Sequence, residues 1–466
     1  MSKKMFLFIC ILLLKVCFGQ FATDSIRVAH IQWPLKDKPL PQQFLSSAKA
    51  NGYNYVLCEY VPFASDWDDN GNIISNPIIL QTRLTQHFQQ ADSAGLRLIP
   101  HFQTGNPHAA FYRYIINSQI PNQLIHQNLP RQSASGDTFY TCHSSFVMSP
   151  DANNAGANLM NNAFGSLWEI VFLAFANAKS TMKYKNLDFV HLGYDENTYS
   201  WGPDTARRVL PLVGLCASDT VWLNAHNLKH SNSITQTQIQ CLYAANIKKR
   251  VNDILSLSNE FGCNTQNIMI WADMFDPCQN GSYPHMCSFK NLFDPKLQSN
   301  DKNYSAKDSL VNVRTVGALN QPDMQAIKGN LILCPWVGSI YNWWGGRYIP
   351  KNVLDTFALY GYKVLYECGA SQFTYNNGIP TYSPWGDPAY QNAFEFAFAA
   401  HDSKYIGSTM GYISVHWSDI AHRDCLDSLQ GRNLIWDPDS DWIKPFNFMG
   451  VLTRINYQRT SELLRY

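Results

Sequence analysis

The stretch Ile26–Trp33 reads IRVAHIQW, and it is the first of eight short apolar runs along the chain. Runs of this kind, rich in Val, Ile, Leu and aromatic residues, are typical of strands in a parallel sheet that is buried on both faces. The eight predicted strands are Ile26–Trp33, Tyr53–Tyr60, Leu96–Phe102, Leu187–Gly193, Ile268–Ala272, Leu331–Val337, Tyr362–Glu367 and Met410–Trp417.

Helical patterns separate these runs. Between residues 159 and 175 apolar side chains recur at three- and four-residue steps, and further helical patterns cover Gln238–Phe261 and Gln391–His401. Gly262 is the expected C-cap of the second of these helices. Eight strand–helix units predict an α/β fold, a (β/α)8 TIM barrel. An open doubly wound sheet is the alternative, but the segment WPLK at residues 33–36 lacks its Gly-rich phosphate turn.

The composition narrows the class of protein. Of the 466 residues 45% are hydrophobic, which allows a large core, and only 15% are charged. Lys and Arg together number 36 and Asp and Glu 35, so the chain lacks the basic excess of a nucleic-acid binder. Low net charge with a high apolar fraction also argues against disorder.

The N-terminus reads as an export signal. Lys3 and Lys4 precede the apolar run Met5–Leu14, which Lys15 ends before it is long enough to span a bilayer. Small residues near Gly19 favour cleavage before Gln20, so residues 1–19 are expected to be a signal peptide of a secreted or exported protein. A lipid anchor on Cys17 is the weaker alternative. No other segment is long and apolar enough to predict a transmembrane span.

The mature chain, residues 20–466, is expected to form one barrel domain. Two long segments, Gly105–Pro150 and Phe275–Asn330, follow the third and fifth predicted strands. They would be insertions at the carboxyl ends of the strands, which is the face where barrel active sites lie.

Ten of the twelve cysteines belong to this mature chain. Cys278 and Cys287 bracket a short polar loop, so a disulfide between them is expected in an oxidising compartment. Cys58, Cys334 and Cys368 lie in predicted strands and are expected to be buried as small hydrophobes. No cysteine pair has the spacing of a metal site, so we expect no zinc site and no cofactor.

Polar and aromatic residues gather where the predicted strands end. Acidic groups with aromatic walls, and no phosphate loop, fit glycoside chemistry, which needs one protonated carboxylic acid and one group that supports an oxocarbenium-like transition state. Adjacent Asp195 and Glu196 repel each other, which favours one acid and one ionised partner. The strand ends include Glu59, His101, His191, Asp195, Glu196, Asp273, Trp336, Tyr366, Glu367, Trp417 and Asp419.

The segment HLGYDE at residues 191–196 resembles the His-x-Gly-Gly-Asp-Glu motif of glycoside hydrolase family 20, the β-N-acetylhexosaminidases. The resemblance implies that Glu196 is the general acid/base. It also implies that Asp195 orients the substrate's own 2-acetamido group, which is the nucleophile in that family.

The resemblance extends weakly to other strand ends. By position His108 would support the acid, Trp271, Trp336 and Trp417 would wall the sugar, and Asp419 would bind its hydroxyl groups. We expect the remaining strand-end residues to contact substrate as well; they are His191, Asp273, Tyr366 and Glu367.

The chain departs from that family at several positions. Tyr194 replaces the second Gly of the motif, and His101 and Gln103 stand where the family has carboxylates. The Arg that the family places after its first strand has no clear counterpart.

Three functions are therefore weighed. The leading one is an exported, retaining exo-β-N-acetylhexosaminidase that uses substrate assistance on a glycan or oligosaccharide. The second is a conventional retaining glycosidase with Glu196 as acid/base and Glu367 as nucleophile. The third is a secreted carbohydrate-binding protein on a barrel without activity.

Overall fold

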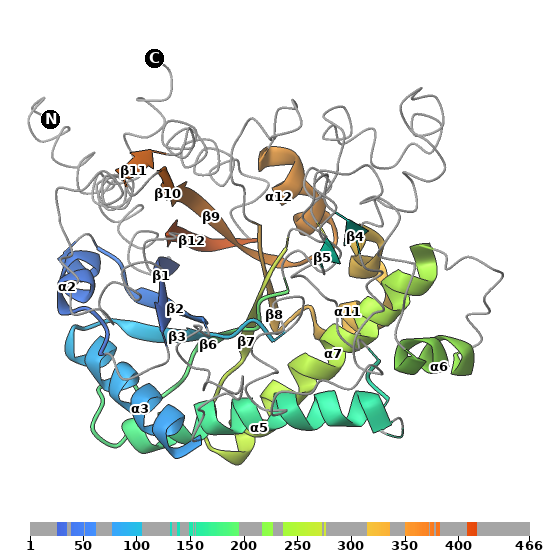
Figure 1. Cartoon of the computed structure of the whole chain (residues 1–466), viewed down its shortest axis with the longest axis horizontal. Coiled ribbons are helices and arrows are strands. Elements are labelled where there is room, and N and C mark those ends of the chain that lie inside the picture. The colour runs from blue at the N-terminus through green and yellow to red at the C-terminus, as the bar shows by residue number, and fades with distance from the viewer. Residues whose placement is uncertain are drawn as a thin grey trace, which may run out of the picture.

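The computed structural model describes residues 26–34, 39–50, 52–61, 77–104, 131–132, 138–139, 149–151, 153, 155–194, 217–226, 236–272, 275, 315–335, 350–371, 373–376, 379–382 and 408–416. Within these ranges the chain forms a closed barrel of eight strands, every pair of which is parallel (Figure 1). The predicted TIM barrel is therefore confirmed, and the open doubly wound sheet is excluded.

The strands follow one another around the barrel in chain order. The last strand, β12, pairs with the first, β1, and this pairing closes the sheet. The eight strands are β1 (Ile26–Pro34), β2 (Tyr55–Val61), β3 (Arg97–His101), β6 (Phe189–His191), β7 (Asn267–Trp271), β8 (Leu331–Cys334), β9 (Lys363–Ser371) and β12 (Thr409–His416). Each overlaps one of the eight predicted runs. The run Leu331–Val337 ends early, at Cys334, because Pro335 has no N–H to continue the ladder.

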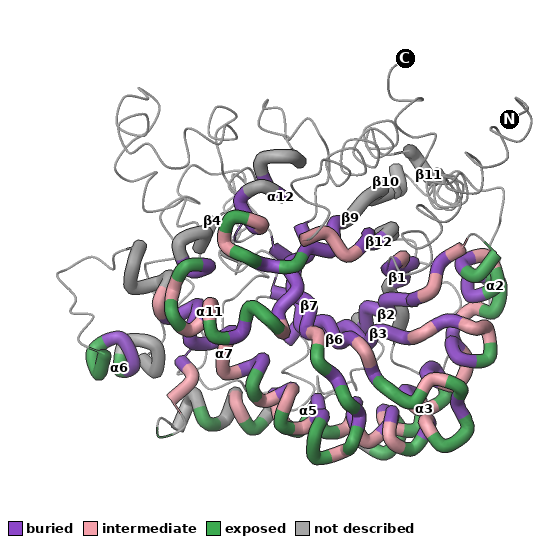
Figure 2. Tube along the Cα trace, turned by 180° about the vertical axis from the view of Figure 1, so that it is seen from behind, coloured by how far each residue is buried: buried purple, intermediate pink, exposed green. Residues whose placement is uncertain are grey.

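Helices cover the outside of the barrel, as the tube in Figure 2 shows, with buried strands at the centre and exposed helical faces around them. The helical pattern around residues 159–175 is α5, and the pattern Gln238–Phe261 is α7, after which Gly262 takes φ +61° as the expected C-cap. The helices are α2 (Gln42–Ala50), α3 (Pro77–Ser93), α5 (Ala155–Ala178), α6 (Ala217–Ala225), α7 (Gln236–Glu260), η6 (Thr315–Asn320), α11 (Pro322–Ile327) and α12 (Pro350–Leu359). Two short hairpins, β4–β5 (Arg131–Gln132, Thr138–Phe139) and β10–β11 (Phe373–Asn376, Ile379–Tyr382), complete the described elements.

The core has two layers, because successive side chains on a strand point to opposite faces. A large outer cluster lies between the strands and the helices and includes Trp168, Phe172 and Ile254. A smaller cluster fills the barrel interior; its buried members are Ile26, Val28, Tyr55, Leu57, Ile99, Phe189, Met269, Trp271, Ile332, Cys334, Leu365 and Ile413. The barrel is thus a packed core up to the level of its carboxyl ends.

Barrel closure depends on a glycine. Gly411 on β12 pairs with Ile26 on β1 and has φ +150°. A Cβ at this position would lie 1.8 Å from the carbonyl oxygen of Ile26 and under 3 Å from two more of its backbone atoms. Only glycine allows the first and last strands to approach this closely.

Several sequence predictions lie outside the described residues, namely the signal peptide, the Gln391–His401 helix, and Cys278 with Cys287. Cys58 and Cys334 are buried, as predicted, while the side chain of Cys368 is outside the described set. Among the described helices, none is long and apolar enough to cross a membrane.

Candidate functional site

The chain that follows β6 is closely held by its neighbours for three residues beyond the strand. Beyond His191, the last residue of β6, the backbone still forms hydrogen bonds to β7 on one side and to Thr104, which follows β3, on the other. Leu192 donates to Met269 of β7 and accepts from Thr104, and the N–H of Trp271 donates to Gly193 at 2.7 Å. The chain then turns through two successive residues with positive φ, Gly193 at +81° and Tyr194 at +80°.

Gly193 is required at this turn for two reasons. Its φ lies in the region that side-chain-bearing residues rarely adopt. A Cβ here would also lie 2.0 Å from Oε1 of Gln103 and 3.0 Å from its Cα. A side chain at residue 193 would therefore displace the Gln103 side chain and crowd its backbone, where the chain runs on past the ends of the third and fourth strands.

Tyr194 adopts the left-handed conformation although it carries a full side chain, which costs about 1–2 kcal/mol. The surrounding structure holds it there. The ring is fully buried, its hydroxyl donates to Oδ1 of Asn246 at 2.6 Å, and its carbonyl oxygen accepts from the hydroxyl of Tyr243 at 3.3 Å. Both partners lie on α7, so this helix fixes the path of the chain immediately before Asp195.

Below this turn, polar side chains occupy the barrel interior. Glu59, His101 and His191 are register partners on three neighbouring strands, β2, β3 and β6, and form one layer across them. His30 of β1 reaches the same layer, where its Nε2 lies 2.9 Å from Oε2 of Glu59. All four side chains are buried.

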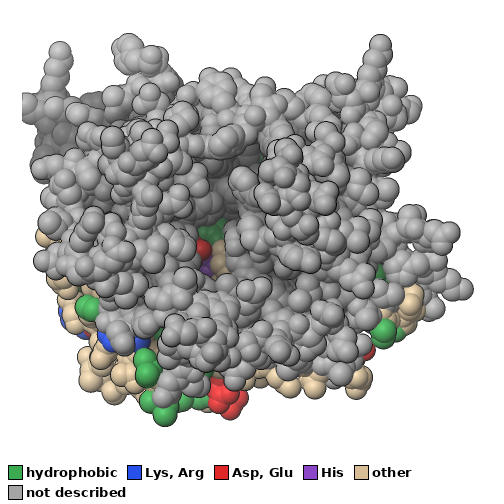
Figure 3. Space-filling view, in the orientation of Figure 1, with side chains coloured by type: hydrophobic (Ala, Val, Ile, Leu, Met, Phe, Trp, Pro, Cys, Tyr) green, Lys and Arg blue, Asp and Glu red, His purple; other side chains and the backbone are tan. Residues whose placement is uncertain are grey.

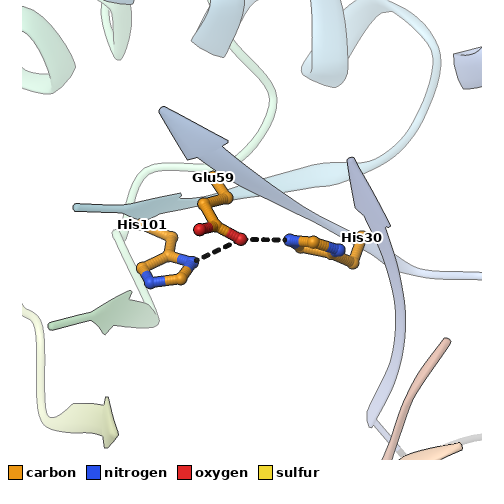
Figure 4. A group of neighbouring side chains, drawn as sticks. All are labelled: His30, Glu59 and His101. Atoms are coloured by element: carbon orange, nitrogen blue, oxygen red, sulfur yellow. Dashed lines mark hydrogen bonds and ion pairs between the residues drawn. The ribbon is translucent and has the colours of Figure 1, made fainter. Parts of the chain in front are cut away.

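The Glu59 carboxylate lies between two imidazole rings (Figure 4). Besides the contact to His30, its Oε2 lies 3.7 Å from Nδ1 of His101, and its Oε1 is 3.5 Å from Nε2 of Gln103. Figure 3 looks onto the molecule in the orientation of Figure 1, and acidic, histidine and hydrophobic atoms of described residues are visible together near the centre of that face.

His191 is held as a neutral imidazole. Burial, and after it the nearby His30, keep its pKa well below the ordinary value. The N–H of Gly193 donates to its Nδ1 at 3.1 Å, so the ring proton is on Nε2. That buried Nε2 has no hydrogen-bond partner within the described part of the chain. It is therefore a buried donor that faces no acceptor among the described residues.

Of the predicted site residues, the structure brings together His191 and Trp271. Their ring centroids are 4.4 Å apart, and the Trp271 ring also packs against His101 at 5.7 Å. Trp271 thus forms a fully buried aromatic wall beside the polar layer.

Tyr366 does not join them. Its ring belongs to the outer core, 6.2 Å from the ring of Tyr412, on the helix-facing side of the sheet. Glu367, the next residue, lies on β9 in register with Ile413, and its side chain is outside the described set. The remaining predicted site residues also fall outside the described ranges; they are Asp195, Glu196, His108, Asp273, Trp336, Trp417 and Asp419.

His30 is a member of this group that the strand-end pattern did not indicate, because it lies in the middle of β1. The alternation of side chains along a strand could have indicated it, because Ile26 and Val28 face the barrel interior and His30 is the next residue on the same face. Glu59, His101 and Gln103 were recognised at strand ends but received no role from the motif. Their contact with one another follows only from the closed barrel.

A scan against protein-family models finds no match for this chain, and a search of curated proteins finds none either. Solved structures do resemble it, and three are representative. The tandem GH20 catalytic modules of the pneumococcal exo-β-D-N-acetylglucosaminidase StrH match with a TM-score of 0.45 at 14% identity, over 96% of this chain and 89% of that chain.

The catalytic domain of β-amylase from Paenibacillus polymyxa matches with a TM-score of 0.45 at 12% identity, over 84% of this chain and 92% of that chain. A GH5-4 broad-specificity endoglucanase from Bacteroides salanitronis matches with a TM-score of 0.41 at 10% identity, over 84% of each chain. All three scores lie below 0.5, so the barrel assignment rests on the strand order and hydrogen bonds of this chain.

Proposed function

We propose that this protein is a glycosidase, and that it acts as a retaining exo-β-N-acetylhexosaminidase through substrate assistance. The observation that carries the proposal is the left-handed turn of Gly193 and Tyr194 at the carboxyl end of β6. This turn directly precedes Asp195 and Glu196, the pair to which the motif resemblance gives the chemistry.

The turn supports the proposal because it accounts for the main departure from the motif. Where the motif has a second Gly, Tyr194 takes φ +80°, a conformation that Gly adopts without cost. A tyrosine held in this conformation is compatible with a motif that has Gly at the same position. Strained residues persist only where their surroundings over-determine them, and they cluster at functional sites.

The barrel interior beneath the turn offers groups that suit a sugar. His191 supplies a neutral N–H donor, and Trp271 supplies an apolar face next to it. Saccharide sites combine aromatic faces with a few fixed hydrogen-bonding groups, because a sugar ring has apolar C–H faces and polar edges.

In the proposed mechanism Glu196 gives its proton to the glycosidic oxygen as the bond to the anomeric carbon breaks. Asp195 accepts a hydrogen bond from the N–H of the 2-acetamido group. The carbonyl oxygen of that group attacks the anomeric carbon and forms a bicyclic oxazolinium ion. Water then attacks the same carbon while Glu196 takes its proton, which restores the acetamido group and releases the sugar with retained configuration.

A second candidate is the conventional retaining mechanism, with Glu196 as acid/base and Glu367 as nucleophile. One observation favours it. Glu367 lies on β9 two residues after Leu365, whose side chain is in the barrel interior. That mechanism requires the two carboxyl groups to be about 5–5.5 Å apart across the sugar.

We also propose that the protein is exported as a single barrel domain after removal of residues 1–19, and that Cys278 and Cys287 form a disulfide. The apolar N-terminal run and the short polar loop between the two cysteines support these proposals. N-terminal sequencing of the secreted protein is expected to begin at Gln20. Peptide mapping without reduction is expected to recover the two cysteines in one linked species.

The activity is tested with a panel of aryl glycosides. We expect hydrolysis of N-acetyl-β-hexosaminides and strong inhibition by a thiazoline that mimics the oxazoline, because it resembles the transition state. Glu196→Gln is expected to lose most activity, and Glu169→Gln, an exposed glutamate on α5, is the matched control.

Two results on this panel would contradict the proposal. Turnover of glycosides without a 2-acetamido group, together with a covalent sugar adduct on Glu367, would favour the conventional mechanism. A folded protein that binds glycans but hydrolyses none of them would instead indicate a carbohydrate-binding barrel without activity.

A further inference from the structure

We propose that His30, Glu59 and His101 form a binding site for a divalent transition-metal ion inside the barrel. The three side chains come from the neighbouring strands β1, β2 and β3. The proposal concerns binding of an ion by these residues and does not depend on the glycosidase activity.

The separations between the donor atoms fit one metal ion. Nε2 of His30 lies 2.9 Å from Oε2 of Glu59, Nδ1 of His101 lies 3.7 Å from the same oxygen, and all three atoms lie within 4.8 Å of one another. In a tetrahedral zinc site with bonds of about 2.05 Å, neighbouring ligand atoms are about 3.3 Å apart. The two separations from Oε2 of Glu59, 2.9 Å and 3.7 Å, lie on either side of this spacing.

The donor types also match. Two imidazole nitrogens with one carboxylate oxygen are a donor set used for Zn²⁺ and for non-heme Fe²⁺, and they leave coordination positions open. A direct hydrogen bond explains the contact of Glu59 with His30. The contact with His101, at 3.7 Å, is longer than a hydrogen bond and close to the spacing of two ligands on one ion.

The surroundings provide a second, independent observation. The buried Nε2 of His191, on the ring that lies beside that of His101, has no hydrogen-bond partner among the described residues. Gln103 is 3.5 Å from Glu59 through its Nε2, and the His191 ring centroid is 4.1 Å from that of His101. A water on an open metal position is the kind of partner such an atom finds.

Trp271 completes the shell on the apolar side. Its ring meets those of His30 and His101 edge to face, at centroid distances of 6.4 Å and 5.7 Å. It restricts rotation of both imidazoles and excludes water from one side. Ligands whose rotation is already restricted lose less conformational freedom when they bind an ion.

The test uses the full mature chain without a histidine tag, freed of metal by dialysis against a chelator. Zn²⁺ is titrated calorimetrically, and Co²⁺ serves as a spectroscopic probe of coordination by its visible d–d absorption. We expect one equivalent of each ion to bind and Zn²⁺ to displace Co²⁺. Glu59→Gln is expected to weaken Zn²⁺ binding by about 100-fold or more, and Glu169→Gln is expected to leave it unchanged.

A second pair of variants and a second measurement distinguish the loss of a metal ligand from the loss of folding. His101→Ala is expected to abolish the Co²⁺ spectrum, and His226→Ala, an exposed histidine after α6, is expected to retain it. Zn²⁺ is expected to raise the unfolding midpoint of the unmutated protein, because an ion that binds only the folded state stabilises it.

Two results would overturn the proposal. One is a folded, unmutated protein that binds no Zn²⁺ or Co²⁺ and whose unfolding midpoint does not respond to Zn²⁺. The other is binding that survives both Glu59→Gln and His101→Ala. In either case Glu59 and His30 form only a buried hydrogen bond.

Discussion

Replacement of Gly193 by Ala tests the geometry of the β6 turn most sharply. A side chain at φ +81° costs about 1–2 kcal/mol. The new Cβ would also overlap Oε1 of Gln103 at 2.0 Å and crowd its Cα at 3.0 Å. The Gln103 side chain can move, but its backbone is held next to Thr104, whose N–H donates to Leu192 at 3.0 Å. Overpacking of this kind costs about 1–3 kcal/mol. We expect Gly193→Ala to lower the free energy of unfolding by about 2–5 kcal/mol.

The assay is urea unfolding followed by far-UV circular dichroism, and the control is the same substitution at Gly165. That glycine lies within α5, and a Cβ there would meet nothing within 4 Å. Gly165→Ala is therefore expected to stabilise the protein by about 0.5–1 kcal/mol, because alanine is the better helix former. The reasoning is refuted if the two variants shift stability in the same direction, or if Gly193→Ala stays within about 0.5 kcal/mol of the unmutated protein.

Three further outcomes are expected. Gly411→Ala should lower the free energy of unfolding by about 3 kcal/mol or more, because the Cβ of the alanine would collide with the backbone of β1. A soluble variant with an unchanged urea midpoint would contradict that expectation. Tyr194→Phe should cost about 1–2 kcal/mol by removing the donor to Asn246 in the same assay, and a neutral effect would show that this bond does not hold the turn. Iodoacetamide at pH 8 should label half-buried Cys241 before buried Cys263 in peptide mapping. Burial raises the pKa of both thiols, that of Cys263 to about 11, so labelling of Cys263 should rise only as the pH approaches that value, and early labelling would argue against its burial.

The barrel could be predicted because its signal is repeated eight times. Buried parallel strands are nearly continuous apolar runs, and helices with apolar stripes separate them, so each element is recognisable by itself. The ends of strands were less predictable. Pro335 stops β8 early, while β9 runs on to Ser371, past the end of its apolar run at Glu367. Ladder hydrogen bonds rather than hydrophobicity decide those ends.

The site could be predicted only in part, because a strand end does not reveal which face a residue occupies. Tyr366 lies near the carboxyl end of the predicted run, yet its side chain packs into the outer core and not into the barrel interior. The contact of His30 with Glu59 joins residues 29 positions apart on different strands. No local spacing signals such a contact, since it depends on the register of β1 with β2.

The most direct test of the proposed function compares leaving groups in Glu196→Gln. If Glu196 is the general acid, a disaccharide β-N-acetylhexosaminide, whose leaving oxygen needs a proton, should lose about 10²–10⁴-fold in kcat/KM. A dinitrophenyl β-N-acetylhexosaminide should lose far less, because its leaving group departs without protonation. Equal losses on the two substrates, or unchanged turnover of both, would contradict the assignment of the acid to the residue that follows the β6 turn.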